Sequence, residues 1–514
     1  MLAGGAVLLL LIATANVAGL ILVRAQGRRR EIATRAALGA SPMRIAGLLI
    51  GEAVNLSVFS GGLGALLAWW AMRIMVATLP RGGLFSFLPS LDRVVINWPA
   101  FLFAMGASML ACLAAGSFPA IATRRADLIA GLKDGAAMDS QSARKILVAA
   151  EIALSVTLLA AAGLLLETMQ HIQAIDPGFR SDHLLALRVP VPRATDRSHA
   201  QAYYRELTAR LAALPGVQSV ALASSQPLTG MHRTEGVEIP GRSGAREADI
   251  RVVTPSYFAT LGIPIHRGRA FDSQDERRAL ISQSLARKYW NEENPIGQII
   301  RVRGESIEII GVCGDTRDVL LRDAAPILYR NWRDQPDGAQ QVDIRTSGDP
   351  LALARAVSRA VGGLGGVVAE VHRGSEFIDD AIWQQKQSAR VLSAFAGLAL
   401  ALAVIGLYGV ISLAIAARTR EIGIRLAIGA RRGDVVGLVL RESVSSVLAG
   451  LALGLAAALA MSRAMASILY RVPPSDPLVL AAVAGSVVFA AILACLLPLR
   501  RALRVDPLTS LRCE

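Results

Sequence analysis

Long apolar runs alternate with short charged segments along this chain of 514 residues. Seven of the runs are near or above the ~20 residues that an α-helix needs to cross a bilayer. They predict membrane helices at Leu2–Val23, Ile45–Leu79, Ala100–Ile121, Ile146–Leu166, Val391–Ala416, Val435–Leu469 and Leu478–Leu499. Because a long polar stretch separates the fourth run from the fifth, the pattern predicts a polytopic α-helical membrane protein of about seven transmembrane helices with one large domain outside the membrane.

The long polar stretch has the periodicity of a mixed α+β domain. Short apolar runs predict strands at Leu184–Val189, Val217–Ala223, Ile250–Val253, Ile299–Val302, Ile307–Val312 and Gln341–Ile344. Apolar residues at helical spacing predict helices at Ala200–Leu214, Ser282–Trp290 and Pro350–Val361. Phe377–Arg390 is expected to continue as a helix into the membrane. At roughly 220 residues, the domain is large enough for two subdomains.

Two charged segments of the chain are copies of one another. Arg28–Ala40 reads RRREIATRAALGA, and Arg418–Ala430 reads RTREIGIRLAIGA. At a constant offset of 390, 13 of 37 positions are identical between 16–52 and 406–442. Self-similarity of this kind indicates a duplicated architecture. Because each copy lies between two predicted membrane helices, it is expected to be a charged loop that joins them.

The duplication divides the chain into five predicted segments. They are a first unit of three helices (1–135), a linker (136–145), a membrane helix (146–167), the large domain (168–389) and a second unit of three helices (390–514). A helix and a large domain precede the second unit, whereas the sequence shows neither before the first. We therefore expect that an equivalent helix and domain once preceded Met1 and were lost, are carried by another chain, or were removed by a wrong start. Dimerisation, or pairing with another such half, is the corresponding expectation.

The net charge of +14 is unevenly distributed. Four segments that flank the predicted helices hold 20 Lys/Arg and 8 Asp/Glu, whereas the large domain (168–390) holds 28 basic and 26 acidic residues. The four basic segments are Arg24–Arg44, Ile121–Lys145, Arg418–Asp434 and Arg500–Glu514. Because positive charge collects on the cytoplasmic side of membrane proteins, the pattern predicts that these segments are cytoplasmic and that the large domain faces outward. The nearly balanced charge of the domain argues against nucleic-acid binding.

Within each copy of the repeated loop, a glutamate and an arginine lie four residues apart, where they share one face of a helix. A glycine follows as a helix stop. The residues are Glu31, Arg35 and Gly39 in the first copy and Glu421, Arg425 and Gly429 in the second. Each loop is predicted to be a short helix on the cytoplasmic surface. It is either an interfacial connector that contacts anionic membrane lipid or a docking element, and the duplication favours docking to a partner with two equivalent grooves.

These loops and several phrases of the large domain resemble a known family. The pattern R-x-R-E-I-x-x-R-x-A-x-G-A is similar to the FtsX-like permease domain. The large domain resembles the periplasmic core domain of MacB-type transporters in Asp176-Pro-Gly-Phe179, Val253-Thr-Pro-Ser-Tyr-Phe258, Gly268-Arg-Ala-Phe271, Asn294-Pro-Ile-Gly297 and Ile309-Ile-Gly-Val312. Two permease units in one chain are similar to the duplicated orphan permeases of that superfamily. The resemblance covers nearly all of the chain.

The resemblance implies an ABC-type permease of the mechanotransmission class, in a bacterial inner membrane and with its large domain in the periplasm. Cytoplasmic ABC ATPase subunits would bind ATP and Mg²⁺, and the six loop residues named above would form two ATPase-coupling helices. A periplasmic or outer-membrane protein is a further expected partner. The implied activity is export, efflux or handover of a substrate such as a lipoprotein. The alternative is a non-transporting signalling or regulatory scaffold that controls periplasmic partners such as cell-wall hydrolases.

The sequence contains no catalytic motif of its own. The phosphate-binding loop GxxxxGK[ST] does not occur, so ATP hydrolysis is assigned to a separate subunit. No HExxH, GxSxG or CxxC arrangement occurs either, and we predict no enzyme activity, no cofactor and no metal site in this chain. Of the four cysteines, Cys313 is alone in the large domain and is expected to be a buried small residue.

Three carboxylates within the predicted membrane helices are candidate functional groups, because charged side chains inside a membrane are costly and often functional. They are Glu52, Glu151 and Glu442. Each lies within about two turns of the predicted cytoplasmic surface. We interpret them as structural groups that pair with Arg44, Arg441 or Lys145, and the alternative is proton transfer.

Two steps of small residues four apart form a further candidate site, because such steps let membrane helices approach closely. They are Ser60 with Gly64 and, at the offset of 390, Gly450 with Gly454. We interpret them as helix-packing residues within the chain. The alternative is a contact between the two permease halves.

Overall fold

The computed structural model of the chain describes residues 2–27, 42–77, 98–125, 136–190, 197–230, 233–242, 246–291, 293–334, 341–417, 432–465 and 469–502. It divides into two compact units. The first, called the helical unit, consists of 1–78, 93–171 and 385–514. The second, called the α+β unit, consists of 79–92 and 172–384.

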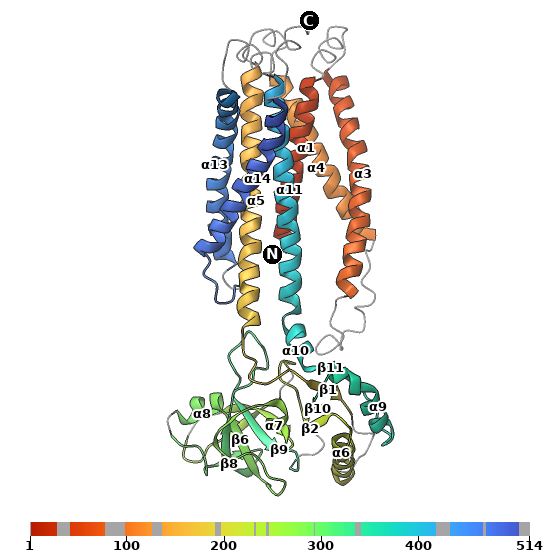
Figure 1. Ribbon diagram of the computed structural model, residues 1–514, viewed down its shortest axis with the longest axis vertical. Coiled ribbons are helices and arrows are strands. Elements are labelled where there is room, and N and C mark those ends of the chain that lie inside the picture. The colour runs from red at the N-terminus through yellow and green to blue at the C-terminus, as the bar shows by residue number, and fades with distance from the viewer. Residues whose placement is uncertain are drawn as a thin grey trace. The chain divides into compact units, whose positions relative to one another are not determined.

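The helical unit is built from long apolar helices (Figure 1). They are α1 (Leu2–Gly27), α3 (Pro42–Ala77), α4 (Trp98–Arg125), α5 (Ala136–Gln173), α11 (Trp383–Ala417), α13 (Arg432–Ala464) and α14 (Pro477–Ala502). In the described part of the chain, six of them contain apolar stretches long enough to cross a membrane, and α4 contains a shorter one, Phe101–Ala111. The prediction of a polytopic membrane protein with about seven helices is confirmed.

The core of the helical unit lies where α5 and α11 pack against α13 and α14. Its buried side chains are mostly small or branched, such as Val156, Leu407 and Val487. Figure 1 shows α5 and α11 in the middle of this unit, with α13 on one side, α1, α3 and α4 on the other, and α14 running obliquely across α5 in this view. α1 lies so close to α11 at Gly5 that an added Cβ would be 2.8 Å from Leu392 Cδ1. The first helix of the first three-helix unit, α1, therefore packs directly against the first helix of the second unit, α11.

Helix α5 begins earlier than the sequence pattern predicts. The segment 136–145 is predicted as a linker, and the membrane helix is predicted over 146–167. Instead α5 runs from Ala136 to Gln173, so the predicted linker forms its first turns. The reason is compositional, because this segment contains no Gly or Pro and its Ala, Met, Gln, Arg and Lys residues all favour helix.

The first half of the α+β unit is an antiparallel sheet covered by helices. Its strands, in spatial order, are β11 (Glu370–Arg373), β1 (Leu184–Arg188), β10 (Gln341–Thr346) and β2 (Val217–Ala223). The helices α6 (Arg197–Ala212) and α9 (Ala354–Gly362) bury Leu207 and Val357 in one hydrophobic core with the strands. A 3₁₀ turn, η5 (Pro350–Leu353), precedes α9. This half is thus a two-layer sandwich of helices on a sheet.

The second half of the α+β unit is a closed ring of strands. Among the described residues, the ring follows the order β4 (Glu247–Val253), β3 (Arg233–Glu238), β7 (Ile299–Val302), β8 (Glu305–Cys313), β6 (Arg278–Ser282) and β9 (Ile327–Asn331), and β9 pairs in parallel with β4 to close it. β5 (Ile265–Gly268) pairs with β8 at its margin. The two halves join where Ala223 of β2 pairs with Val253 of β4.

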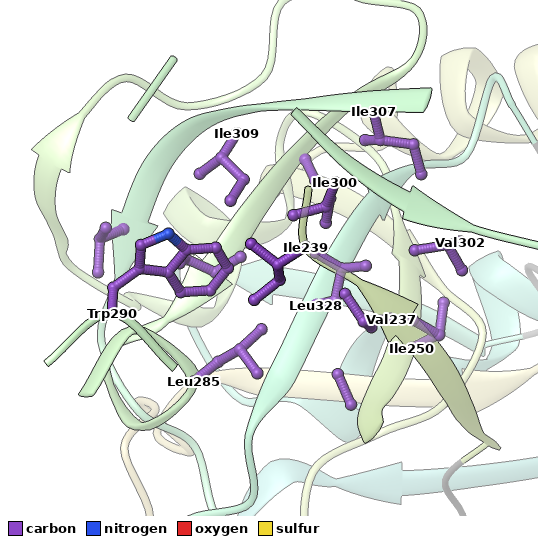
Figure 2. Close-up of a cluster of buried hydrophobic side chains, with 14 residues drawn as sticks. Val237, Ile239, Ile250, Leu285, Trp290, Ile300, Val302, Ile307, Ile309 and Leu328 are labelled. Carbon is purple, nitrogen blue, oxygen red and sulfur yellow. The ribbon is translucent and has the colours of Figure 1, made fainter. Parts of the chain in front are cut away.

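The interior of the ring is filled by apolar side chains. Figure 2 shows Trp290 and Leu285, from α8 (Gln283–Trp290), pointing toward Ile239, Ile309 and the strand side chains around them. The indole Nε1 of Trp290 donates a hydrogen bond to Gln298 Oε1 over 2.7 Å. Small closed barrels have interiors just wide enough for side chains. The ring is therefore a packed core.

The structure contains each strand that the sequence predicts in this domain and the helices predicted over Ala200–Leu214 and Ser282–Trp290, with shifts of a few residues at their ends. The helix predicted over Pro350–Val361 begins as the 3₁₀ turn η5 and continues as α9. The structure adds elements that the sequence does not predict, namely β3, β5, β6, β9, β11 and α7 (Tyr257–Leu261). One predicted helix is divided. Instead of a continuous helix over Phe377–Arg390, α10 (Gly374–Ala381) ends before Ile382, and α11 begins at Trp383. The backbone of Ile382 leaves helical geometry, with φ −113° and ψ 8°.

Candidate functional site

The residues predicted to couple the protein to an ATPase belong to the two repeated loops. Glu31, Arg35, Gly39, Glu421, Arg425 and Gly429 all lie outside the described residues. Their assignment rests on the sequence repeat alone. The helices that bound the loops are described, and they are α1 and α3 for the first copy and α11 and α13 for the second.

Of the three predicted intramembrane carboxylates, the structure describes the side chain of Glu151. Glu52 and Glu442 belong to α3 and α13, and their side chains lie outside the described part of the structure. Glu151 on α5 is only 3% exposed. Its carboxyl group accepts a hydrogen bond from the side-chain amide of Asn16 on α1. The same amide nitrogen donates to the backbone oxygen of Leu402 on α11 over 2.9 Å.

The partner of Glu151 therefore differs from the sequence-based expectation. A cation, namely Arg44, Arg441 or Lys145, was the expected partner, whereas the structure gives the carboxyl group a neutral amide. The physical reason is position. Glu151 lies about four turns from the beginning of α5, where Asn16 of α1 and Gly406 of α11 are its neighbours. A single amide thereby joins three helices at one level of the helical unit.

The small-residue steps have different surroundings in the two copies of the repeat. A Cβ added at Gly450 would lie 2.6 Å from the backbone oxygen of Ala149, and one at Gly454 would lie 2.6 Å from Val156 Cβ. Gly450 and Gly454 therefore hold α13 directly against α5. In the first copy, Ser60 is exposed and a Cβ added at Gly64 would meet nothing within 4 Å.

The α+β unit contains a buried ion pair that the sequence pattern does not predict. Arg251 on β4 is ion-paired with Asp318, and both side chains are less than 5% exposed. Arg251 Nη1 also lies 3.4 Å from Thr316 Oγ1 and 3.5 Å from the hydroxyl of Tyr257. Thr316 in turn hydrogen-bonds the hydroxyl of Tyr329 over 3.2 Å. These polar groups are held together inside an otherwise apolar region, close to where the two halves of the domain join.

A second buried carboxyl group, Asp343 on β10, lies in the first half of the domain. Its side chain is fully buried, and Oδ1 accepts a hydrogen bond from the amide of Gln226, whereas Oδ2 has no hydrogen-bond partner. Burial raises the pKa of Asp343 to about 7, and the hydrogen bond from Gln226 opposes part of that rise. Asp343 is thus a group that can change its protonation near neutral pH.

Two further features concern metal-binding clusters and the cysteine of the α+β unit. Among the described residues, no group of three or more His, Cys, Asp or Glu side chains could hold a metal ion. Cys313 is fully buried, which confirms its interpretation as a small core residue. Burial raises the pKa of its thiol, which makes it a poor nucleophile.

The sequence analysis does not single out Asn16 or Arg251, two of the polar residues at these sites. Asn16 carries one signal, because it is the sole amide or charged side chain in the apolar run Leu2–Val23. Arg251 has a similar signal, as a charged residue with Ile250 before it and two valines after it in a predicted strand. In each case the sequence marks a polar residue in an apolar element, and only the fold shows its partner.

Comparison with known protein families matches both units. The FtsX-like permease C-terminal family matches residues 4–128 and again 393–507. The MacB-like periplasmic core domain family matches residues 146–359. Together these matches cover most of the chain. The chain belongs to the MacB/FtsX-like permease family. The duplicated FtsX-like match coincides with α1, α3 and α4 and with α11, α13 and α14, so this ABC transporter permease contains two FtsX-like units and one MacB-like domain.

Curated relatives of this permease carry ABC-transporter names. The uncharacterized ABC transporter permease YknZ of Bacillus subtilis is 23% identical over 341 residues, which are 61% of this chain and 84% of that protein. The macrolide export ATP-binding/permease protein MacB of Agrobacterium fabrum is 28% identical over 236 residues, 43% of this chain. The match spans only 36% of that MacB. Among solved structures, the periplasmic region of MacB from Actinobacillus actinomycetemcomitans is 14% identical with a TM-score of 0.30, and the match covers 43% of this chain and 98% of that one.

Proposed function

We propose that this permease is the membrane subunit of an ABC-type system in a bacterial inner membrane, and that it transmits the motion of cytoplasmic ATPase subunits to its periplasmic domain for export, efflux or substrate handover. The observation that carries the proposal is the repeated charged loop. The same Glu-x-x-x-Arg-x-x-x-Gly spacing occurs between the first two helices of each FtsX-like unit. Two equivalent loops suit two equivalent grooves of an ATPase pair.

The connection between the two units supports a mechanical role. The chain enters the periplasmic domain through α5, of 38 residues, and returns through α11, of 35 residues. At 1.5 Å per residue each helix is longer than the ~30 Å hydrocarbon core of a bilayer. α5 and α11 also form the core of the helical unit with α13 and α14. A displacement applied at the cytoplasmic loops would therefore act on the two helices that lead to the domain.

The motor in this proposal is a separate polypeptide. The printed sequence lacks the GxxxxGK[ST] loop with which ATPases bind nucleotide phosphates. The MacB relative is named an ATP-binding/permease protein, and the match to this chain spans 36% of it. ATP and Mg²⁺ would accordingly be bound by partner ATPase subunits, and the role of this chain would be to dock them and to move.

The test is a pull-down from native membranes in mild detergent, followed by identification of co-purifying ATP-binding proteins by mass spectrometry. The variant carries four alanine substitutions, Glu31→Ala, Arg35→Ala, Glu421→Ala and Arg425→Ala. We expect wild-type protein to retain an ABC ATPase and the variant to lose most of it. The physical reason is that the variant removes the charged face of both coupling helices.

The matched control removes one glutamate and one arginine at the same spacing from an exposed helix of the α+β unit. Glu206 and Arg210 on α6 form an exposed ion pair four residues apart, with 2.8 Å between Oε1 and Nε. The Glu206→Ala, Arg210→Ala variant is expected to retain the ATPase like wild type. Absence of any ATPase from the wild-type sample would overturn the coupling proposal. If a cell-wall hydrolase were present instead, the result would favour a regulatory scaffold over a transporter.

A further inference from the structure

Asn16, Glu151 and Gly406 meet inside the helical unit, where α1, α5 and α11 come together. The proposed coupling function makes no use of them. Asn16 is 8% exposed and Glu151 3% exposed, so both polar side chains are buried among apolar helices. Polar groups in such surroundings are costly unless they are hydrogen-bonded. Their burial therefore needs a structural or functional reason.

The three residues fit one another closely. The amide of Asn16 donates one hydrogen bond to Glu151 and a second to the backbone oxygen of Leu402. Gly406 provides the space for this arrangement. A Cβ added there would overlap Glu151 Oε2 and would lie 2.7 Å from Asn16 Oδ1. Any larger residue at position 406 would consequently displace the carboxyl group or the amide.

The internal repeat gives this contact a particular meaning. Asn16 and Gly406 occupy equivalent positions of the two copies, at the offset of 390. At that level the first copy carries an amide and the second carries a glycine, and the carboxyl group of Glu151 lies close to both. The contact is thus asymmetric, although the helices that form it are related. A single buried polar contact can fix the register of helices that apolar packing alone leaves adjustable.

At Gly5, α1 also approaches α11 and α5, and there the neighbouring side chains are apolar. A Cβ added at Gly5 would approach Leu392 and Phe395 of α11 and Leu158 of α5. In a membrane such contacts have little specificity, because lipid tails are as apolar as the side chains they replace. A hydrogen-bonded contact has no equivalent partner in lipid. Lipid can therefore replace the contact at Asn16 less readily than the apolar contact at Gly5.

We propose that Asn16, Glu151 and Gly406 form a polar junction that holds the first FtsX-like unit against the second within the membrane and fixes the register of α1 on α5 and α11. Glu151 acts in it as a hydrogen-bond acceptor. Its rival role, as a proton carrier in transport, would require an ionisable carboxyl group. Glutamine separates the two roles, because it keeps the size and the acceptor oxygen of glutamate and cannot ionise. The proposal does not rest on the coupling function, because assembly is measurable without an ATPase.

The experiment uses the full chain with a protease site inserted in 126–135, between α4 and α5, and an affinity tag after Glu514. The protein is purified in mild detergent, cleaved, and held on the resin, and the rate at which the first fragment washes off is measured. We expect the fragments of wild type and of Glu151→Gln to remain together. Asn16→Leu, Glu151→Leu and Gly406→Val should release the fragment about tenfold faster, the size of effect expected for one interhelical hydrogen bond.

Two matched controls separate the junction from general damage to the helices. Gly409→Val is one turn along α11 from Gly406, at a position where an added Cβ meets nothing within 4 Å. Thr14→Leu removes a polar side chain from α1 whose hydroxyl bonds the backbone oxygen of Leu10 in the same helix, over 2.7 Å. Both controls should retain the fragment as wild type does.

A double substitution guards against simple misfolding. If the junction is one coupled contact, Asn16→Leu combined with Glu151→Leu should release the fragment no faster than Asn16→Leu alone, because Asn16→Leu already removes both hydrogen bonds. Gel filtration before cleavage excludes aggregated variants. Retention by Asn16→Leu equal to that of wild type would overturn the proposal. Release by Glu151→Gln as fast as by Glu151→Leu would also overturn it, and would favour a role for the ionised carboxylate.

Discussion

Arg251 on β4 and Asp318, in the segment between β8 and β9, form an ion pair from which water is almost completely excluded. The pair ties a strand of the closed ring to the loop that follows another strand of the same ring. Buried ion pairs contribute little net stability compared with a well-packed apolar pair, but removing one partner leaves an isolated buried charge. The ion pair therefore affects the stability of the domain most strongly when one of its two partners is removed.

The first prediction is that Asp318→Ala strongly destabilises the periplasmic domain. The guanidinium of Arg251 would be left buried without its counter-charge, and such losses cost about 3–5 kcal/mol. Hydrogen–deuterium exchange of the full-length protein in detergent measures this change. The free energy of opening derived from the exchange rates of β4 peptides should fall by a corresponding amount.

The control for this prediction is an exposed ion pair in the same domain. Arg210→Ala breaks the pair with Glu206, whose two side chains are about half exposed. Exposed pairs contribute only ~0–1 kcal/mol. Equal loss of protection in the Asp318→Ala and Arg210→Ala variants would show that burial of the Arg251 pair has no energetic consequence.

The second prediction concerns pH. The pKa of Asp343 is about 7 in the folded domain, against an ordinary value of 3.8. Between these values the folded state keeps a proton that the unfolded state has lost, so this residue makes the domain less stable as pH rises from about 4 to about 7. Asp343→Asn keeps an acceptor oxygen for Gln226 and carries no charge. Its stability relative to wild type should therefore rise as the pH increases from about 4 to about 7 and stay constant above that, so that the stability of the variant depends less on pH.

The effect of Asp343 is measured by unfolding the full-length protein thermally at several pH values. Hydrogen–deuterium exchange of β10 peptides monitors the unfolding. Gln226→Ala is the companion variant, because loss of its hydrogen bond should raise the pKa of Asp343 further and extend the loss of stability to higher pH. Parallel pH curves for wild type and Asp343→Asn would mean that another group controls the pH response.

How much of the fold the sequence reveals depends on where the stabilising contacts lie. β4 and β8 are apolar enough to be predicted, because their own residues form much of the ring core. β3 reads RTEGVE and β11 reads EVHR, which are too polar to predict as strands. β3 exists because it pairs with β4 on one side and β7 on the other. Such strands form because they pair with strands that are distant in the sequence. The local pattern of apolar and polar residues carries no information about those partners.

For the candidate site, the sequence likewise indicates individual residues but not the contacts between them. Glu151 is conspicuous in the sequence as a charged residue in an apolar run, and the repeat shows that Asn16 and Gly406 are equivalent. Neither observation indicates that Asn16 contacts Glu151, 135 residues away. The contact depends on how α1 packs against α5 and α11, a tertiary relationship between helices whose apolar surfaces look alike in sequence. For that reason the sequence suggested nearby arginines and lysine as partners instead.

The third prediction tests burial and orientation by thiol labelling. In a protein whose other three cysteines are replaced by serine, Cys313 should resist a membrane-impermeant maleimide until the domain is unfolded, because it is fully buried. Val367→Cys, at a position that is 69% exposed, should react readily in spheroplasts without unfolding. If Val367→Cys reacted only after the cells were permeabilised, the domain would face the cytoplasm.

The fourth prediction uses the two copies of the repeat as their own control. Gly454→Val should destabilise the helical unit by about 1–3 kcal/mol, the usual cost of overpacking, because an added Cβ would already lie 2.6 Å from Val156 Cβ. Gly64→Val is the equivalent change in the first copy, where the added carbon would meet nothing within 4 Å, and it should be nearly neutral. The apparent melting temperature in detergent, read by aggregation after heating, distinguishes the two. Because both changes add the same atoms at equivalent positions, equal melting temperatures would show that the close approach of α13 to α5 contributes nothing to stability.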